Sequence, residues 1–367
     1  MLNKLFELAK KENASDLHIK VDGYPGIRIN GKLSLLKDFE IMTSEIMEKI
    51  LNEILNEEEK KEFFKNKNYD IAYTSKIKDR YRINLFIQQG KPALAMRRIA
   101  NKILTIKELG LPDEIKEIAK EKRGLILVTG AAGNGKSTTI SAMIEYINNN
   151  NSKNIITLED PIEYIFKEDK SIINQREIPY DMNNYYEALK YVLRQDPDII
   201  FIGELRDKET MDAAMKASET GHLVVSTLHT VNSYQTINRI INFYPSMEQK
   251  QIRIQLADNL KSVISQRLLQ KKDGVGRVIA VEIMKTTPTI REAIVNIDMI
   301  EEIPILIKKG KEIYGMQTFD QSISSLYLDN KISYEIALES ATVKKDIELL
   351  KSGISSGSAS DFYNEMM

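Results

Sequence analysis

The chain has 367 residues, more than a single compact core usually holds, so two domains are expected. Its 52 basic and 53 acidic residues give a net charge of −1, which argues against a nucleic-acid partner because phosphate binding needs a basic excess. There is no cysteine, which excludes disulfide bonds and thiolate metal sites, and no run of about 20 apolar residues, so no direct membrane insertion is expected.

The first hundred residues predict a small α+β domain. The spacing of apolar residues predicts helices over 2–12 and 43–65. Strands are expected at 15–21, 26–33, 80–89 and 93–100. Within 80–89 the apolar side chains alternate with polar ones, which is typical of a sheet that has one face in solvent.

A different pattern follows a predicted linker at 101–112, and it indicates a second domain over 113–367. Nearly all-apolar runs expected to be strands lie at 124–130, 154–160, 198–204, 222–229 and 277–284. Helices are expected between them at 136–149, 183–195, 207–220 and 248–270. Strands that are apolar on both faces need helices on both sides, so we predict an α/β fold with a doubly wound, mostly parallel sheet. Residues 288–350 predict further helices, and the Gly/Ser-rich segment 352–360 predicts a mobile tail.

The sequence GAAGNGKS at 130–137 matches the phosphate-loop pattern G-x-x-x-x-G-K-[ST] without a mismatch. It follows an apolar strand and opens a helix, so backbone N–H groups and the helix dipole would face the phosphates of ATP. Lys136 is expected to reach the terminal phosphates, and the hydroxyl of Ser137 to bind Mg²⁺. The predicted nucleotide-binding residues are Gly130, Ala131, Ala132, Gly133, Asn134, Gly135, Lys136, Ser137 and Thr138.

Acidic residues at strand ends are candidates for the hydrolytic chemistry, which needs one carboxylate near the metal and another group to orient water. Glu204 ends the run DIIFIGE and is expected to order the Mg²⁺ shell through water. Glu163, in TLEDPIEY, is expected to polarise the attacking water, although the two roles could be exchanged. Glu159 and Asp160 fit a direct role or a turn before Pro161 equally well.

The histidines His222 and His229 bracket one apolar strand of the second domain. His229 is expected to act as a sensor of the γ-phosphate or of conformation. For His222 a functional and a purely structural role are equally compatible with the sequence, and His18 is expected to be structural.

Arginines can complete phosphoryl transfer by neutralising charge in the transition state. Arg82 and Arg97 lie on two predicted strands of the first domain, where spacing alone favours a solvated sheet face over a catalytic role. Arg206 and Asp207, directly after the strand that ends in Glu204, fit a helix cap and an interface pair.

Seven segments together resemble the type II/IV secretion ATPase superfamily, and within it the retraction ATPases of type IV pili. They are ASDLHI (14–19), RYRINLF (80–86), GAAGNGKST (130–138), ITLEDPIEY (156–164), QDPDIIFIGELRD (195–207), ETGHLVVSTLHT (219–230) and GMQTFDQS (315–322). The resemblance covers nearly the whole chain.

This resemblance implies a PAS-like domain over 1–100 followed by a RecA-like P-loop ATPase domain, assembled as a homohexamer. It implies ATP and Mg²⁺ as ligands, and it matches Arg82 and Arg97 to arginines that reach the phosphates from the N-terminal domain. The implied partners are a PilC-like platform protein of the inner membrane and, indirectly, the pilins. The implied location is the cytoplasm, at the inner face of the cytoplasmic membrane.

Within the superfamily, the length of the chain and its lack of a four-cysteine zinc motif favour pilus retraction over extension or type II secretion. Two segments depart from the family pattern. Residues 131–135 read Ala-Ala-Gly-Asn-Gly where Pro-Thr-Gly-Ser-Gly is usual. Residues 289–296 read TIREAIVN where the retraction ATPases have AIRNLIRE.

Three alternatives to a retraction motor stay open at the level of sequence. The same engine could serve as an assembly or accessory motor of a pilus or of a type II secretion-like machine. A scaffold that binds ATP without turnover is disfavoured because Lys136, Ser137, Glu163 and Glu204 are all present. A DNA translocase is disfavoured by the net charge.

Overall fold

The computed structural model describes residues 1–29, 31–99 and 102–352 of the chain. The described residues form two compact units, one within residues 1–102 and one within residues 103–352, apart from 163–165. Residues 103–112, which the sequence suggests as a linker, are part of the second unit, where Ile106 and Leu111 are buried in its core.

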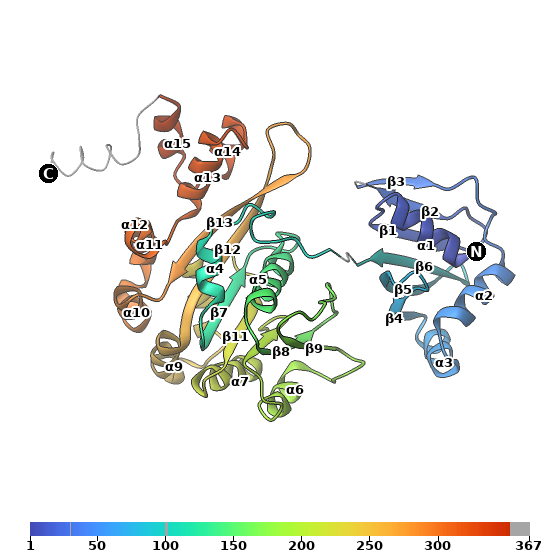
Figure 1. Cartoon of the computed structure of the whole chain (residues 1–367), viewed down its shortest axis with the longest axis horizontal. Helices are drawn as coiled ribbons and strands as arrows, with labels where there is room; N and C mark the ends of the chain where they lie inside the picture. Colours follow the sequence, from blue (N-terminus) through green and yellow to red (C-terminus); the bar gives the residue numbers. More distant parts are fainter. Residues whose placement is uncertain (30, 100–101, 353–367) are drawn as a thin grey trace. The chain divides into compact units, whose positions relative to one another are not determined.

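The first unit is a six-stranded antiparallel sheet with helices on one face (Figure 1). Its strands lie in the order β3-β2-β1-β6-β5-β4. Their bounds are β1 Asp16–Lys20, β2 Gly26–Ile29, β3 Lys32–Leu35, β4 Asn68–Thr74, β5 Arg80–Gln88 and β6 Lys91–Arg98. The helices are α1 Leu2–Lys11, α2 Ser44–Ile54 and α3 Glu57–Asn66.

The alternation expected along β5 is present in the structure. Tyr81, Ile83 and Leu85 are fully buried, and Phe6 of α1 stacks on Tyr81 with ring centroids 4.3 Å apart. The side chains between them face away from this core, and Arg82 among them is exposed. The sheet therefore has one covered face and one open, polar face, as its sequence predicts.

The second unit is built on a seven-stranded sheet in the order β13-β12-β7-β11-β10-β8-β9. Its strands are β7 Gly124–Thr129, β8 Asn154–Glu159, β9 Ile172–Glu177, β10 Ile199–Ile202, β11 Leu223–Leu228, β12 Leu260–Gln270 and β13 Arg277–Lys285. All neighbouring pairs are parallel except β12 with β13.

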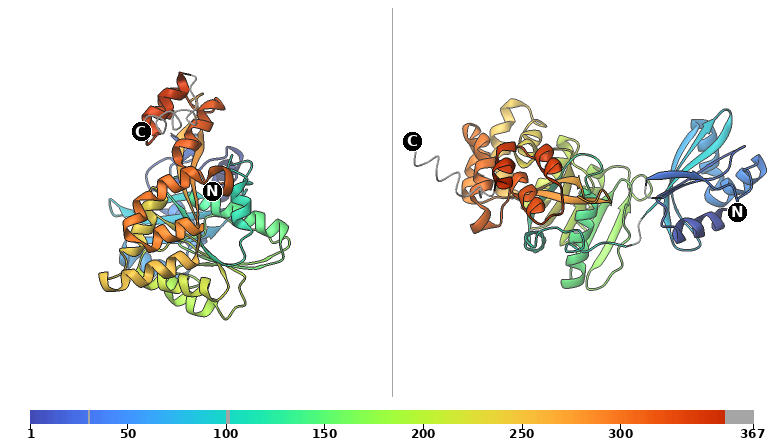
Figure 2. Two further views of the ribbon diagram at one scale, coloured as in Figure 1. Left: turned by 90° about the vertical axis from the view of Figure 1, so that its left-hand side faces the viewer. Right: turned by 90° about the horizontal axis from the view of Figure 1, so that it is seen from above.

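Both faces of this sheet are buried beneath helices (Figures 1 and 2). Along β7, Leu125 and Leu127 face one apolar cluster, whereas Ile126 and Val128 face another. The helices α4 Glu114–Ala119 and α5 Lys136–Asn150 contribute to the second cluster. The first is formed with α6 Tyr185–Val192, α7 Lys208–Glu219, α8 Ser233–Ile241, α9 Ser246–Asn259 and α10 Pro288–Val295. The predicted fold class is confirmed: a mostly parallel sheet with helices on both faces follows a small α+β unit.

The prediction of one helix over 248–270 is wrong in its second half. The helix α9 ends at Asn259, and residues 260–270 form β12, which pairs with β7 on one side and β13 on the other. No glycine or proline separates the two elements, so the sequence contains no stop signal for the helix. Pairing on both sides decides the conformation of residues 260–270, which include the β-branched Val263 and Ile264.

Further elements differ from the sequence prediction. The helix expected over 43–65 is two helices, α2 and α3, separated by Leu55 and Asn56. The expected strand at 26–33 is a hairpin, β2 and β3. The edge strands β4 and β9 were not predicted, because their residues are polar for most of their length. Edge strands bury less than central ones, so their sequences show weaker patterns.

The chain then forms helices that complete the second unit. They are the 3₁₀ helix η1 Ile297–Glu302 and the α-helices α11 Ile303–Lys309, α12 Lys311–Tyr314, α13 Phe319–Leu328, α14 Tyr334–Ser340 and α15 Lys344–Lys351. Figure 1 shows α13, α14 and α15 gathered beside β12 and β13, where Leu269 and Ala280 join their apolar cluster. The predicted mobile tail lies outside the described residues, apart from Ser352. No helix in the described part of the chain is long and apolar enough to cross a membrane.

Candidate nucleotide site

The phosphate loop joins the end of β7 to the start of α5, as the sequence predicts. Gly130, Gly133 and Gly135 have φ angles of 147°, 77° and 81°, which side-chain-bearing residues rarely adopt. Space is also restricted at Gly130, where a Cβ atom would lie 2.7 Å from the carbonyl oxygen of Gln266. The loop therefore keeps its backbone exposed to a ligand while it packs closely on β12.

Lys136 is the first residue of α5 and is 92% buried, with its side chain folded over the loop. Its Nζ donates to the carbonyl oxygens of Gly130, at 2.9 Å, and Ala131, at 3.3 Å. The same Nζ lies 3.4 Å from Nδ1 of His229. The ammonium group thus lies at the N-terminal end of a helix, where anions are stabilised.

Glu204 and His229 extend this cluster. Glu204 follows β10 and His229 follows β11, and Nε2 of His229 lies 3.4 Å from Oε1 of Glu204. The imidazole is therefore held between the ammonium of Lys136 and the carboxylate of Glu204. The carboxyl ends of three parallel strands bring these residues together, as expected for a ligand site in such a sheet.

Arg206 forms a hydrogen bond with the other oxygen of the Glu204 carboxylate. Its Nε donates to Glu204 Oε2 at 2.7 Å, and its Nη1 lies 3.8 Å from Asp160 Oδ2. The hydrogen bond with Glu204 raises the pKa of the Arg206 guanidinium, so this arginine stays charged. Asp207 caps α7 by accepting a hydrogen bond from the Thr210 backbone N–H at 2.8 Å, which is the cap that the sequence suggests.

The other acidic candidates, Glu159, Asp160 and Glu163, differ in burial and in their partners. Glu159 is buried and accepts hydrogen bonds from Thr157 at 2.6 Å and Gln175 at 3.2 Å, which favours a structural role. Asp160 precedes a cis peptide bond to Pro161 and faces Arg206. Glu163 is exposed in the segment after β8.

The structure places His222 away from the phosphate loop. His222 precedes β11, and its Nδ1 lies 2.9 Å from the carbonyl oxygen of Ala217 and 3.1 Å from Thr220 Oγ1. A strand of six residues separates it from His229, a rise of about 20 Å. Within one chain, only His229 of this pair lies beside Lys136 and Glu204. His18 lies in the middle of β1 in the first unit.

Arg82 and Arg97 face each other across β5 and β6 on the open face of the first sheet. Arg97 donates from Nε to Asp16 Oδ1 at 3.0 Å, and its side chain is 76% exposed. Asp16 Oδ2 also lies 3.6 Å from Arg28 Nε. Three arginines and one aspartate thus form a basic row across four strands, and this row is accessible to an anionic ligand.

Tyr185, the first residue of α6, is a neighbour of Glu204 that the sequence did not reveal. A Cβ atom on Gly203 would lie 2.6 Å from the Tyr185 hydroxyl oxygen, so the phenol packs directly on Gly203. Burial and the nearby charge of Asp160 raise the pKa of Tyr185, so its hydroxyl stays protonated.

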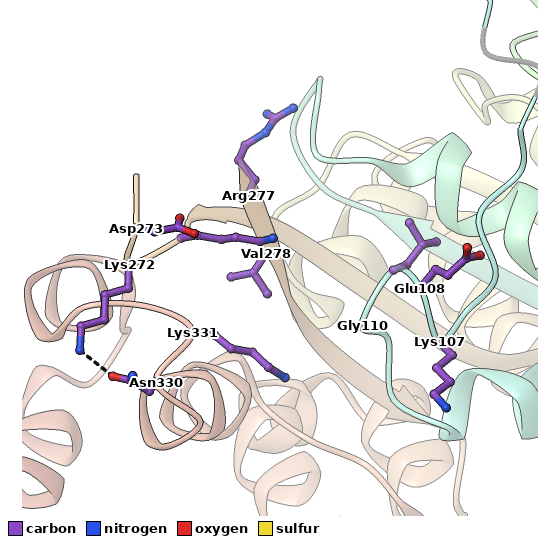
Figure 3. Close-up of a pocket in the computed structure, with 11 residues that line it drawn as sticks. Lys107, Glu108, Gly110, Lys272, Asp273, Arg277, Val278, Asn330 and Lys331 are labelled. Atoms are coloured by element: carbon purple, nitrogen blue, oxygen red, sulfur yellow. Dashed lines mark hydrogen bonds between the residues drawn. The ribbon is translucent and has the colours of Figure 1, made fainter. Parts of the chain in front are cut away.

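A cavity of about 670 Å³ lies near the phosphate loop, at the turn between β12 and β13. Figure 3 shows Val278 and Lys331 on one side of it and Lys107 and Glu108 on the other. Its lining residues are Lys107, Glu108, Leu109, Gly110, Lys271, Lys272, Asp273, Arg277, Val278, Asn330 and Lys331. The cavity begins three residues, about 10 Å, beyond Leu268, whose N–H donates to Asn134 of the loop at 3.4 Å.

The oxygens near the loop suit Mg²⁺. The cation prefers oxygen ligands and keeps several waters, so it needs few protein groups when it also binds phosphates. The Ser137 hydroxyl and the Glu204 carboxylate supply such oxygens. Among residues 1–29, 31–99 and 102–352, no three His, Asp or Glu side chains gather as a metal site.

A parallel sheet with a phosphate loop after one strand and a carboxylate after another defines a P-loop nucleotide hydrolase. The family model described as "Type II/IV secretion system protein" matches residues 1–358. The chain belongs to this family.

Named relatives agree with this assignment. The chain is 38% identical over 358 residues to the type IV pilus ATPase PilU of Pseudomonas aeruginosa, covering 98% of this chain and 92% of PilU. It is also 38% identical over 345 residues to the type IV pilus retraction ATPase PilT of the same organism, covering 94% and 99%. A crystal structure of the pilus retraction motor PilT with bound ADP is 41% identical and superposes with a TM-score of 0.87, covering 94% of this chain and 98% of that one. Fold, phosphate loop and relatives together indicate an ATPase.

Proposed function

We propose that this chain is the ATPase motor that drives retraction of a type IV pilus. The observation that carries the ATPase activity is the arrangement of Lys136, His229 and Glu204 at the phosphate loop, joined by two 3.4 Å contacts. The direction of the motor rests on the similarity to PilT over 94% of this chain.

In this proposal each group at the loop has a separate role. Lys136 and the loop N–H groups bind the phosphates, and Ser137, with Glu204 through water, holds Mg²⁺, which would neutralise phosphate charge. Glu163 orients the attacking water. His229 responds to the γ-phosphate because it lies between Lys136 and Glu204, the two groups nearest the expected charge change.

The base and ribose of ATP would occupy the cavity beside β12 and β13. The cavity lies about 10 Å along β12 from the loop contact at Leu268. Its volume of about 670 Å³ is within the usual range of small-molecule sites.

The assembly is proposed from the family resemblance. The PAS-like first domain, residues 1–100, would supply Arg82 and Arg97 to the phosphates, and six subunits would form a ring with the RecA-like domain of residues 113–367. The ring would work in the cytoplasm against a PilC-like platform protein of the inner membrane, and through it on pilins, without a nucleic-acid partner. His222, remote from the loop in its own chain, would act at most at a contact between subunits.

The biochemical test compares the purified chain with its Lys136→Ala variant. Removing the ammonium deletes a charge contact with the phosphates, so we expect weaker ATP binding and loss of turnover. The measurements are phosphate release and binding of a fluorescent ATP analogue. Lys190→Ala, on the exposed surface of α6, is the matched control. Unchanged affinity in Lys136→Ala would refute the assignment of the site.

The cellular test deletes the gene in its own host and restores it as wild type or Lys136→Ala. A retraction motor predicts more surface pili and lost twitching in both the deletion and the Lys136→Ala strain. A second candidate, an accessory motor of the same pilus, predicts pilus numbers near wild type and twitching that is reduced but not lost. Loss of pili would instead identify an assembly motor.

A further inference from the structure

Glu282 is a buried carboxylate without a role in the proposed chemistry. It lies in β13 and is 7% exposed. Along this strand it stands between Ala280 and Met284, which pack in two different apolar clusters. Burial raises the pKa of Glu282, which reflects the unfavourable transfer of a carboxylate from water. Such a group is stable only with good partners, so its contacts identify what it holds.

The closest described partner of Glu282 is the start of α8. The backbone N–H of Ser233 donates to Glu282 Oε1 at 2.7 Å. The first N–H groups of a helix lack partners within the helix. The side chain of the N-cap residue, Asn232, accepts from Gln235 N at 2.8 Å, and Glu282 satisfies the neighbouring donor.

The segment held by this contact begins at His229. Only three residues separate His229 from Ser233. Thr236 of α8 stabilises the turn between His229 and Ser233. Its hydroxyl donates to the Asn232 carbonyl oxygen at 2.8 Å and lies 2.7 Å from the Thr230 hydroxyl. The position of His229 therefore depends on where α8 begins.

Glu282 is also tied to the strand that carries the phosphate loop. It pairs in register with Ser265 of β12, and Ser265 pairs in register with Thr129, the last residue of β7. The hydroxyl of Thr129 donates to Ser265 Oγ at 2.9 Å, and Gly130 follows directly. One carboxylate thus connects the sheet behind the phosphate loop with the turn that carries His229.

Other charges face this carboxylate from the elements around it. Arg267 of β12 lowers the pKa of Glu282 and Asp320 of α13 raises it. A second cavity, of about 620 Å³, opens beside Glu282. Lys308 and Lys311 are among the residues that line it. Arg267 is engaged elsewhere, since it donates to the Ser340 carbonyl oxygen at 3.1 Å and covers the ring of Phe319.

We infer that Glu282 is a positioning residue that fixes the start of α8 relative to the phosphate loop and so holds His229 between Lys136 and Glu204. The inference rests on the proposed ATPase chemistry for its effect on turnover, although the contact itself does not. An amide at this position could still accept from Ser233, whereas an apolar side chain of similar length could not.

The test compares Glu282→Met with Glu282→Gln in the full chain. We expect Glu282→Met to lower kcat about tenfold or more, the effect of losing one charge-assisted hydrogen bond, with ADP affinity within about twofold of wild type. Glu282→Gln should recover most of the turnover. Asp346→Asn, which lines the same cavity from α15, is the control and should leave turnover unchanged.

A double-mutant cycle with His229→Ala shows whether Glu282 acts through the histidine. If it does, Glu282→Met combined with His229→Ala falls no further than His229→Ala alone. Multiplied effects would overturn the inference, as would equal losses in Glu282→Met and Glu282→Gln.

Hydrogen exchange provides a measurement that does not depend on activity. The amides at the start of α8 should exchange faster in Glu282→Met than in wild type, and near the wild-type rate in Glu282→Gln. Unchanged exchange in Glu282→Met would show that Glu282 does not fix the start of α8. A wild-type chain without ATP turnover would refute the proposed function, while the exchange experiment would still decide the role of Glu282.

Discussion

At the scale of residues, the candidate site depends on which end of a strand each side chain follows. His229 and Glu204 follow their strands, and Lys136 follows the loop after β7, so parallel strands bring all three to one edge of the sheet. His222 precedes the same strand that His229 follows and therefore lies at the opposite edge. The two histidines have similar surroundings in the sequence, but strand direction separates them.

The first prediction at this scale concerns the separate roles proposed for Glu163, which orients water, and Glu204, which holds Mg²⁺ through water. Glu163→Gln should keep ADP binding but reduce turnover by about 10²–10⁴, the usual contribution of a group that activates water. Glu204→Gln should instead raise the Mg²⁺ concentration needed for turnover, because it removes charge from the metal shell. Steady-state phosphate release, measured across a Mg²⁺ titration, distinguishes the two.

Asp169→Asn is a suitable control because Asp169 is also exposed in the segment after β8. Turnover equal to wild type in Glu163→Gln would assign the activation of water to Glu204.

The phosphate loop and Glu204 could be predicted from sequence, whereas Tyr185 and Glu282 could not. The loop is a continuous motif whose spacing is set by the ligand. Tyr185 reaches Gly203 from a helix 18 positions earlier, and Glu282 reaches Ser233 from a strand 49 positions later. Contacts of this kind depend on the packed fold and leave no local signal in one sequence.

At the scale of elements, the parallel strands were the most predictable part of the molecule. Strands β7, β8, β10 and β11 are buried on both faces, and their apolar runs predict them without ambiguity. Strand β12 is also central, but it contains Ser262, Ser265 and Gln266, all buried and polar. Ser265 and Gln266 have partners behind the phosphate loop in Thr129 and Thr139, and these polar residues interrupt the apolar pattern.

The contact between α6 and the end of β10 gives a prediction at this scale. Gly203→Ala would place a Cβ atom 2.6 Å from the Tyr185 hydroxyl oxygen and 3.3 Å from the Leu158 carbonyl oxygen. Overpacking of this kind costs about 1–3 kcal/mol, so we expect a lower midpoint of urea unfolding and reduced turnover because Glu204 is adjacent.

A second substitution isolates the cause. Tyr185→Phe removes the oxygen, and the nearest ring atom would then lie 3.4 Å from the new Cβ. The double variant Gly203→Ala with Tyr185→Phe should therefore recover much of the lost stability, with Tyr185→Phe alone as the reference. A double variant as unstable as Gly203→Ala would show that the Leu158 carbonyl, and not Tyr185, requires glycine at this position.

At the scale of the whole molecule, two units with separate cores must cooperate if arginines of the first act on a nucleotide bound to the second. Arg82 and Arg97, which share a basic row with Arg28 and Asp16, are the arginines of the first unit that the family resemblance matches to this role. Both Arg82 and Arg97 are charged and exposed on this sheet.

The corresponding prediction is that Arg82→Ala lowers turnover of the full-length chain by about 10³-fold, the effect typical of an arginine that neutralises phosphoryl charge. Nucleotide affinity should change much less. Arg28→Ala removes an arginine from the same row and should stay within about twofold of wild type. Phosphate release is measured together with light scattering, which monitors assembly. Equal turnover of Arg82→Ala and wild type would restrict the chemistry to the second unit.

The order of strands in the second sheet has a consequence for synthesis of the protein on the ribosome. All six strands of the first sheet lie within residues 16–98, so that sheet can close early. Strand β7 pairs with β11, about 100 residues later, and with β12, which starts at Leu260. At about 5–20 residues per second, this apolar strand waits roughly 7–27 seconds for its second neighbour. During that interval a nascent chain contains the complete phosphate-loop sequence but no folded phosphate site, and β7 lacks its second neighbour for longer than any strand of the first sheet.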